Sequence, residues 1–176
     1  MQATKTLATG ARFQTAIGIA AAAMLALLWL TPAQAQESVQ RGRVIWGQKA
    51  GCIFCHGWSG DGHGDEHADG AAANIRETIL TRDQIHEVIK CGRPGSAMPH
   101  FDKFAYTDKR CYDATEADLG KDTPPSPPTP LQIFEVDAVA DYVAAKIKGA
   151  GPVMADECRE YFGGAGAICE KYPARK

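Results

Sequence analysis

The sequence lacks the patterns that mark several common protein classes. No stretch alternates apolar and polar residues as a half-buried strand does, and no segment repeats at a fixed period, so neither a β-sheet nor a repeat architecture is expected. Only one Cys-x-x-Cys pair occurs, so the second pair of a four-cysteine zinc site is absent. The longest apolar run, Ile17–Leu30, is shorter than the about 20 residues that span a bilayer.

The N-terminus has the organisation of an export signal. Lys5 and Arg12 precede the apolar run Ile17–Leu30, and residues 31–35 supply an Ala-x-Ala cleavage site. We therefore predict that residues 1–35 are a signal peptide and that the mature protein works in the periplasm, where cysteines are oxidised. An uncleaved segment that anchors the protein to a membrane is the alternative.

Basic residues are scarce in the expected mature chain. Removal of residues 1–35 takes away two of them and leaves 17 Lys and Arg against 21 Asp and Glu, a formal charge of −4. This balance argues against nucleic acid and against an anionic membrane surface as partners. The 141 residues that remain suit a single domain.

The segment Cys52-Ile53-Phe54-Cys55-His56 carries the most specific chemistry in the chain. Two cysteines separated by two residues, with histidine directly after them, form the attachment motif of a c-type haem. The thiols of Cys52 and Cys55 would hold one covalent haem, and the His56 imidazole would be the proximal iron ligand. A redox dithiol or half of a zinc site is the alternative for the pair, but the export signal favours haem attachment.

Three longer helices are expected in the mature chain. The first covers Glu37–Lys49, where Ser38 can cap the N-terminus. The second begins near residues 81–84 and ends at Cys91–Gly92. The third covers Phe134–Lys148 and carries apolar residues at helical spacing, which are Val136, Val139, Ala140, Val143 and Ile147.

Two connecting segments have a distinctive composition. Residues 57–70 carry five glycines and four acidic residues without an apolar period, so they are expected to form a surface loop. Asp122–Pro130 contains five prolines and is predicted to be a stiff, extended spacer without a core of its own. The C-terminal residues 154–176 show little periodicity.

A six-coordinate haem iron needs a second protein ligand. Only Met98 and Met154 follow the signal peptide, and Met98 lies in a loop rich in glycine and proline just after the second helix. Because a thioether is a weak donor that the fold must hold in place, we predict Met98 as the distal ligand. The alternative is that Met98 fills a gap in the core.

The histidines compete with Met98 for the iron. His100 lies two residues from Met98, and His86 lies on the second helix. His63 and His67 are four residues apart, a spacing that could bind a metal on a helix, but the glycines around them favour solvated side chains.

The order of these parts resembles a class I c-type cytochrome over roughly Val39 to Lys148. The resemblance rests on Cys-x-x-Cys-His followed by Gly-x-x-Met-Pro at Gly95–Pro99. It implies an all-α fold in which the first and last helices cross beside one covalent haem. Gly42 and Trp46 match the small and aromatic residues of the first helix, and Tyr142 matches the aromatic residue of the last.

The resemblance also implies a haem environment after the glycine loop. Asn74-Ile75 is similar to the Asn-Leu segment that lines the haem in this family, and Arg76 could approach a propionate. Family members often have a proline before this segment, and its carbonyl accepts a hydrogen bond from the proximal imidazole. Ala72 and Ala73 stand at that place here, which leaves this contact open.

Four cysteines remain once Cys52 and Cys55 are assigned to haem. An even number in an exported protein predicts two disulfides, with three possible pairings. Sequence proximity favours Cys91–Cys111, which would enclose the Met98 loop, and Cys158–Cys169. The Cys158–Cys169 bond would cross-link residues 151–176. These residues are expected to form a C-terminal extension to a cytochrome domain over residues 36–150.

These features predict a one-electron carrier rather than an enzyme. An iron ligated by His56 and Met98 has no open position for oxygen or peroxide. The chain is also similar to the small periplasmic cytochromes that serve quinoprotein alcohol dehydrogenases, which implies a dehydrogenase donor and a cytochrome or oxidase acceptor. Two alternatives stay open: a peroxidase-like haem enzyme with a labile distal ligand, and a permanent cytochrome subunit of a dehydrogenase.

Overall fold

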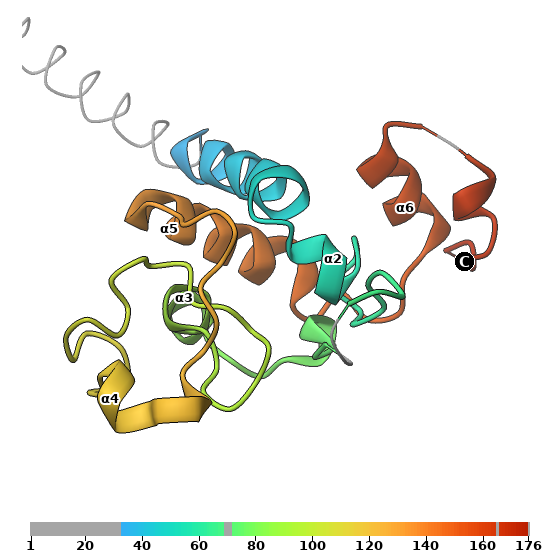
Figure 1. The fold of residues 1–176 in the computed structure, drawn as a ribbon. Helices are drawn as coiled ribbons and strands as arrows, with labels where there is room; N and C mark the ends of the chain where they lie inside the picture. The colour runs from blue at the N-terminus through green and yellow to red at the C-terminus, as the bar shows by residue number, and fades with distance from the viewer. Residues whose placement is uncertain (1–32, 69–71, 165, 176) are drawn as a thin grey trace, which may run out of the picture. The chain divides into compact units, whose positions relative to one another are not determined.

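The computed structural model describes residues 33–68, 72–164 and 166–175 (Figure 1). Most of the predicted signal peptide, including all of Ile17–Leu30, lies outside these residues. Residues 38–176 form one compact unit, to which the description below applies. Among the described helices, none has both the length and the apolar character to cross a membrane.

The described chain is helical and contains no strand. Residues 33–44 are helical and continue into a π-helical turn, η1 (Ile45–Lys49). The elements that follow are α2 (Cys52–His56), η2 (Ile75–Glu77), α3 (Arg82–Cys91), α4 (Glu116–Leu119), η3 (Gly120–Asp122), α5 (Ile133–Tyr142), η4 (Val143–Ile147), α6 (Ala155–Phe162) and η5 (Ala167–Cys169). The all-α class is therefore confirmed. The short elements α4 and α6 were not predicted.

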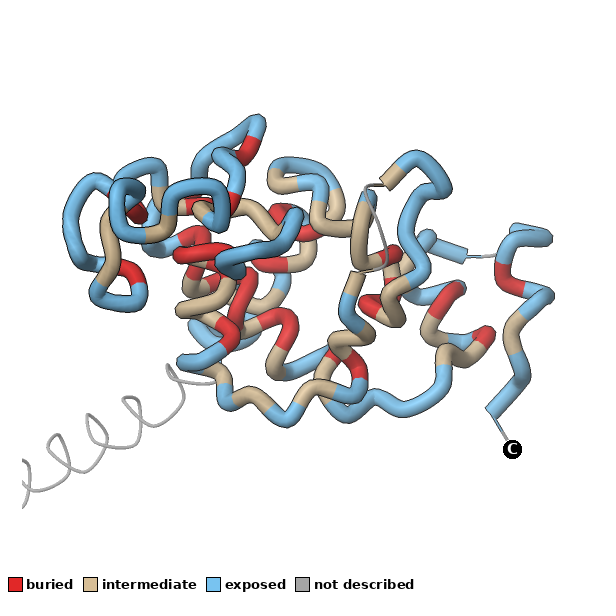
Figure 2. Tube along the Cα trace, turned by 60° about the horizontal axis from the view of Figure 1, so that its bottom comes forward, coloured by how far each residue is buried: buried red, intermediate tan, exposed pale blue. Residues whose placement is uncertain are grey.

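The core is built around α5 and its continuation η4. Both α3 and η1 pack against α5, and the buried positions concentrate where these helices face one another (Figure 2). All five apolar residues predicted for this helix are buried, namely Val136, Val139, Ala140, Val143 and Ile147. The helical period of the sequence thus identified the central helix and its inner face.

The N-terminal helix (residues 38–44) and α5 approach closely at Gly42. A Cβ atom on Gly42 would lie 1.9 Å from the Ala138 carbonyl oxygen and 2.7 Å from the Tyr142 Cβ, so only glycine fits. One turn later Trp46 is buried, and its ring lies 6.2 Å from the Tyr142 ring. This contact directs the chain that leaves η1 towards α2.

The ends of the helices follow local side-chain chemistry. Thr81 caps α3 and exchanges hydrogen bonds with Gln84, within the helix start predicted near residues 81–84. The prediction for Ser38 was wrong, because the helix already covers the residues before it. The Ser38 hydroxyl instead donates to the Asp141 carboxylate on α5, and so joins the N-terminal helix to α5.

The close contact at Gly42 generates a stability prediction. Gly42→Ala should lower the free energy of unfolding by about 3 kcal/mol, because the methyl group overlaps the Ala138 carbonyl and the helices must separate. Chemical denaturation measures this change. Gln40→Ala, at an exposed position of the same helix, is the control and should leave stability nearly unchanged. Equal stability of both variants would contradict the packing described.

Candidate functional site

The two motif cysteines lie on one short helix, α2, whose N-cap residue is a glycine. Gly51 adopts a left-handed conformation (φ 65°) directly before α2, which turns the chain sharply out of η1. Cys52 and Cys55 are three residues apart on this helix, so their side chains share a face, and both are half-buried. Neither takes part in the two disulfides, which use the other four cysteines.

The thiol chemistry at α2 differs from that of a redox dithiol. Burial raises the pKa of the Cys52 thiol to about 12, and the neighbouring Cys55 adds to this shift, against a smaller lowering by a backbone hydrogen bond. Redox-active Cys-x-x-Cys pairs have lowered pKa values, because the thiolate is the reactive species. Cys52 is therefore held protonated at neutral pH.

The His56 imidazole is oriented by a backbone carbonyl. Its Nδ1 lies 3.2 Å from the Ala73 carbonyl oxygen, which can only accept, so Nδ1 carries the proton. This leaves Nε2 with an unshared electron pair, the form that binds a metal. Burial lowers the pKa of His56, with a smaller opposing effect from the Ala73 bond, so the neutral ring is favoured.

Ala73 therefore supplies the carbonyl that accepts the hydrogen bond from the imidazole, a contact that the sequence left open. The carbonyl is a backbone group, so alanine can supply it as well as proline, provided that the segment is held in place. The sequence placed Ala72 and Ala73 at this position but left the contact open, because the acceptor depends on backbone position and not on side-chain type.

The tryptophan beside His56 carries an unmatched polar atom. The Trp46 ring is 2% exposed and its centroid lies 5.9 Å from that of His56. Its buried Nε1 has no hydrogen-bond partner among the described residues. Two thiols, a neutral imidazole and this unmatched donor form a set that fits a covalently attached, iron-bearing macrocycle.

The glycine-rich segment folds back onto α2. The Asp65 amide donates to the Phe54 carbonyl (2.7 Å), and the Gly62 amide donates to the His56 carbonyl (3.0 Å). A Cβ on Gly64 would lie 2.1 Å from the Phe54 oxygen, so the backbones touch directly. The prediction of a surface loop thus holds for exposed residues 63–67, whereas Gly57 and Gly60 are buried.

The loop that carries Met98 is braced by the proline-rich segment. The Gly95 amide donates to the Asp122 carbonyl (2.7 Å), and the His100 amide donates to the Pro125 carbonyl (3.1 Å). Pro124 and Pro127 are buried. The prediction of a stiff spacer without a core of its own did not anticipate this packing. Prolines pack here because their fixed backbone costs little entropy to order.

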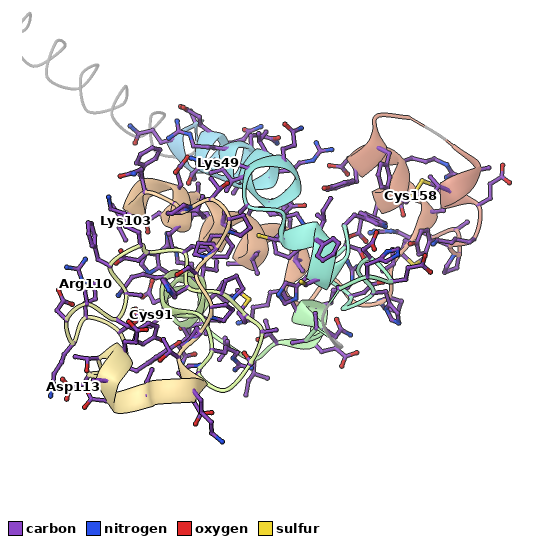
Figure 3. All side chains as sticks on the ribbon, in the orientation of Figure 1. Lys49, Cys91, Lys103, Arg110, Asp113 and Cys158 are labelled. Carbon is purple, nitrogen blue, oxygen red and sulfur yellow. A yellow bond between two sulfur atoms is a disulfide. The ribbon has the colours of Figure 1, made fainter. Side chains whose placement is uncertain are left out.

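The disulfide Cys91–Cys111 closes the other side of this loop. The bond joins the end of α3 to residue 111, with Cα atoms 5.5 Å apart, and both cysteines are fully buried (Figure 3). Tyr106 donates to the Cys91 carbonyl at 2.6 Å, and Tyr112 donates to the Gly92 carbonyl at 2.9 Å. The predicted pairing is confirmed, as is Cys158–Cys169 in the C-terminal extension.

Met98 packs against the same core as the motif. Its half-buried side chain lies against the main cluster of buried residues, which Cys52, Ile53 and Ile75 also contact. Met154 is also half-buried, but it precedes α6 in the C-terminal extension. The structure thus brings Cys52, Ile75 and Met98 to one core.

The other histidines have separate contacts. His100 is 8% exposed, its Nδ1 lies 2.8 Å from the Asp102 carbonyl, and its Nε2 lies 3.4 Å from the Ser126 hydroxyl. Both ring nitrogens of His100 therefore contact oxygen atoms of the surrounding loops. His63 and His67 are exposed, and they face Asp61 and Asp65 respectively.

Arg76 does not have the role suggested for it. It is 3% exposed, and its guanidinium donates to the Glu157 carboxylate at 2.7 and 2.9 Å. The remaining donors bond to the carbonyls of Ser59, Gly151 and Pro152. With its donors engaged by protein oxygens, Arg76 is a link to the C-terminal extension rather than a contact for a propionate.

Comparison with known proteins identifies no relative. No protein-family model, curated protein or solved structure matches this chain. The two disulfides by themselves indicate an oxidising environment outside the cytoplasm.

The bracing of the Met98 loop can be tested through the disulfide. Replacing Cys91 and Cys111 by serine should lower the free energy of unfolding by about 3 kcal/mol, because the open chain gains entropy on unfolding. Amide exchange at His100 should also accelerate. Replacing Cys158 and Cys169 by serine is the matched control, and it should leave exchange at His100 unchanged. Unaltered exchange in the first variant would show that the loop does not depend on the bond.

Proposed function

We propose that this protein is a monohaem class I c-type cytochrome that carries single electrons in the periplasm. Cys52 and Cys55 would hold the haem covalently, and His56 and Met98 would be its axial iron ligands. When bound, the haem supplies an iron centre that changes its charge by one electron. The chain's own contribution is to attach, orient and enclose this group.

The observation that carries the proposal is the hydrogen bond from His56 to Ala73. It fixes the neutral imidazole with Nε2 unprotonated, directly after two thiols on one helical face. A metal-binding histidine is commonly oriented in this way by an acceptor at its other nitrogen. The raised pKa of Cys52 disfavours the competing assignment as a redox dithiol.

Electron transfer is favoured over catalysis by the contacts of His100. An enzyme would need an acid–base group near the iron, and His100 was the nearest candidate in the sequence. Its ring is buried, packs edge-on to Tyr106 and has both nitrogens engaged. The carrier would accept electrons from a dehydrogenase, such as a quinoprotein, and pass them to a cytochrome or oxidase whose docking surface is basic.

Haem attachment can be measured on the exported protein. Mass spectrometry of the periplasmic form should show one haem added to a chain that lacks about the first 35 residues. A Cys55→Ser variant should lose one thioether bond. Recovery of the exported parent protein without haem would refute the proposed function.

Ligation by Met98 predicts a change in the optical spectrum. Met98→Ala should abolish the weak sulfur-to-iron absorption band and lower the reduction potential, because thioether ligation favours the ferrous state. Met154→Ala is the matched control and should change neither property. A parent spectrum without this band would exclude Met98 as the distal ligand, and His100→Ala would then be compared next. A band that persists in Met98→Ala would assign the sulfur ligand to Met154, the other methionine that follows the signal peptide.

A further inference from the structure

Residues 72–77, which end in the 3₁₀ turn η2, are hydrogen-bonded to two distant parts of the chain. On one side, the Ile75 amide donates to the Gly60 carbonyl at 2.8 Å. On the other, the Gly149 amide donates to the Arg76 carbonyl at 2.8 Å. The Ala73 carbonyl that accepts from His56 belongs to this segment, so its position depends on these contacts.

The guanidinium of Arg76 joins the two sides. It donates to the Ser59 carbonyl at 2.9 Å, three residues after His56 in the chain. It also bonds to Gly151, Pro152 and Glu157, all in the C-terminal extension. Its side chain is 2% exposed, whereas that of Glu157 is 26% exposed, so the carboxylate lies between the buried cation and solvent.

The extension has further contacts that keep Glu157 in place. Trp58 packs against Tyr161 and Tyr172, with ring centroids 5.1 and 5.9 Å apart, and its Nε1 donates to the Tyr172 hydroxyl at 3.2 Å. Arg43 on the first helix lies over the Tyr161 ring at 5.0 Å. The Cys158–Cys169 disulfide, one residue beyond Glu157, joins α6 to η5 (Figure 3).

We infer that Arg76 and Glu157 are positioning residues for the proximal histidine: through them the C-terminal extension sets the hydrogen bond between Ala73 and His56. The inference rests on the proposed function for its redox consequence, but the positioning itself is a property of the protein chain. The C-terminal extension then contributes to the geometry of the site, although none of its residues touches His56 in the described contacts.

Electrostatics explains why this pair acts as a unit. A buried guanidinium that loses its only carboxylate partner is left as an uncompensated charge, and the segment that carries it must move towards water. Lysine at position 76 would keep the charge but cannot form the same planar set of bonds to four residues. Arg76→Lys therefore changes the geometry of these hydrogen bonds and keeps the positive charge, whereas Glu157→Gln removes the negative charge and keeps the side-chain shape.

The principal test compares Arg76→Lys with Asp156→Asn in the full-length exported protein. Asp156 is the neighbour of Glu157 on α6, and its side chain is 52% exposed. In Arg76→Lys, exchange of the His56 Nδ1 proton, followed by NMR, should accelerate at least tenfold. The reduction potential should rise, because a weaker acceptor makes the imidazole a poorer donor to the ferric state. A tenfold change in the redox equilibrium corresponds to about 59 mV. Asp156→Asn should match the parent in both measurements.

Glu157→Gln provides a second test if Arg76→Lys does not fold. It keeps the shape of the side chain and removes the charge, and it should also accelerate exchange at His56 and raise the potential. Parent-like exchange and potential in the variant that folds would overturn the inference. Faster amide exchange at Ile75 and Gly149 without any change at His56 would also overturn it, because the pair would then only stabilise the fold.

The proposed function and the positioning role fail in different ways. Absence of covalent haem from the parent protein would refute the function. The protonation of His56 at Nδ1 and its proton exchange can still be compared in the haem-free parent and Arg76→Lys proteins. Equal exchange in both would then overturn the positioning role on its own.

Discussion

The close contact between the N-terminal helix and α5 at Gly42 determines where the motif helix α2 can lie. The Ala138 backbone occupies the space that a side chain at position 42 would need. The two helices therefore pack against each other in one register. Trp46 is then buried against Tyr142, and the chain that leaves η1 must turn at Gly51 into α2. The cysteines and His56 are thus placed by a contact that involves none of them.

Backbone groups do most of the positioning around the motif. Carbonyls of Phe54 and His56 accept from the glycine loop, and the carbonyl of Ala73 accepts from His56 itself. On the other side of the core, carbonyls of Asp122 and Pro125 hold the Met98 loop. Glycine and proline are abundant in these segments because the first permits close backbone approach and the second limits the entropy lost on ordering.

The sequence was sufficient for features that depend on local chemistry or helical period. It identified the start of α3 near residues 81–84, the buried face of α5 and both disulfides. It did not identify the packing of the proline segment or the partners of Arg76, because these depend on residues far apart in the chain. The Ser38 cap was wrong for a related reason: the hydroxyl bonds to Asp141, 103 residues away.

The location of Glu157 has a consequence for the order in which the site is completed. On the proposed function, the exported chain would enter its new compartment with the N-terminus first, so α2 and residues 72–77 would emerge before the extension. During that interval Arg76 would have no carboxylate from α6, and residues 72–77 would lack the contacts that residues 149–157 make to them. On the proposed function, the motif is thus open to a modifying enzyme while the chain is being translocated. The contacts to Glu157 would form only when the extension arrives, so the extension would complete the site after the motif has emerged.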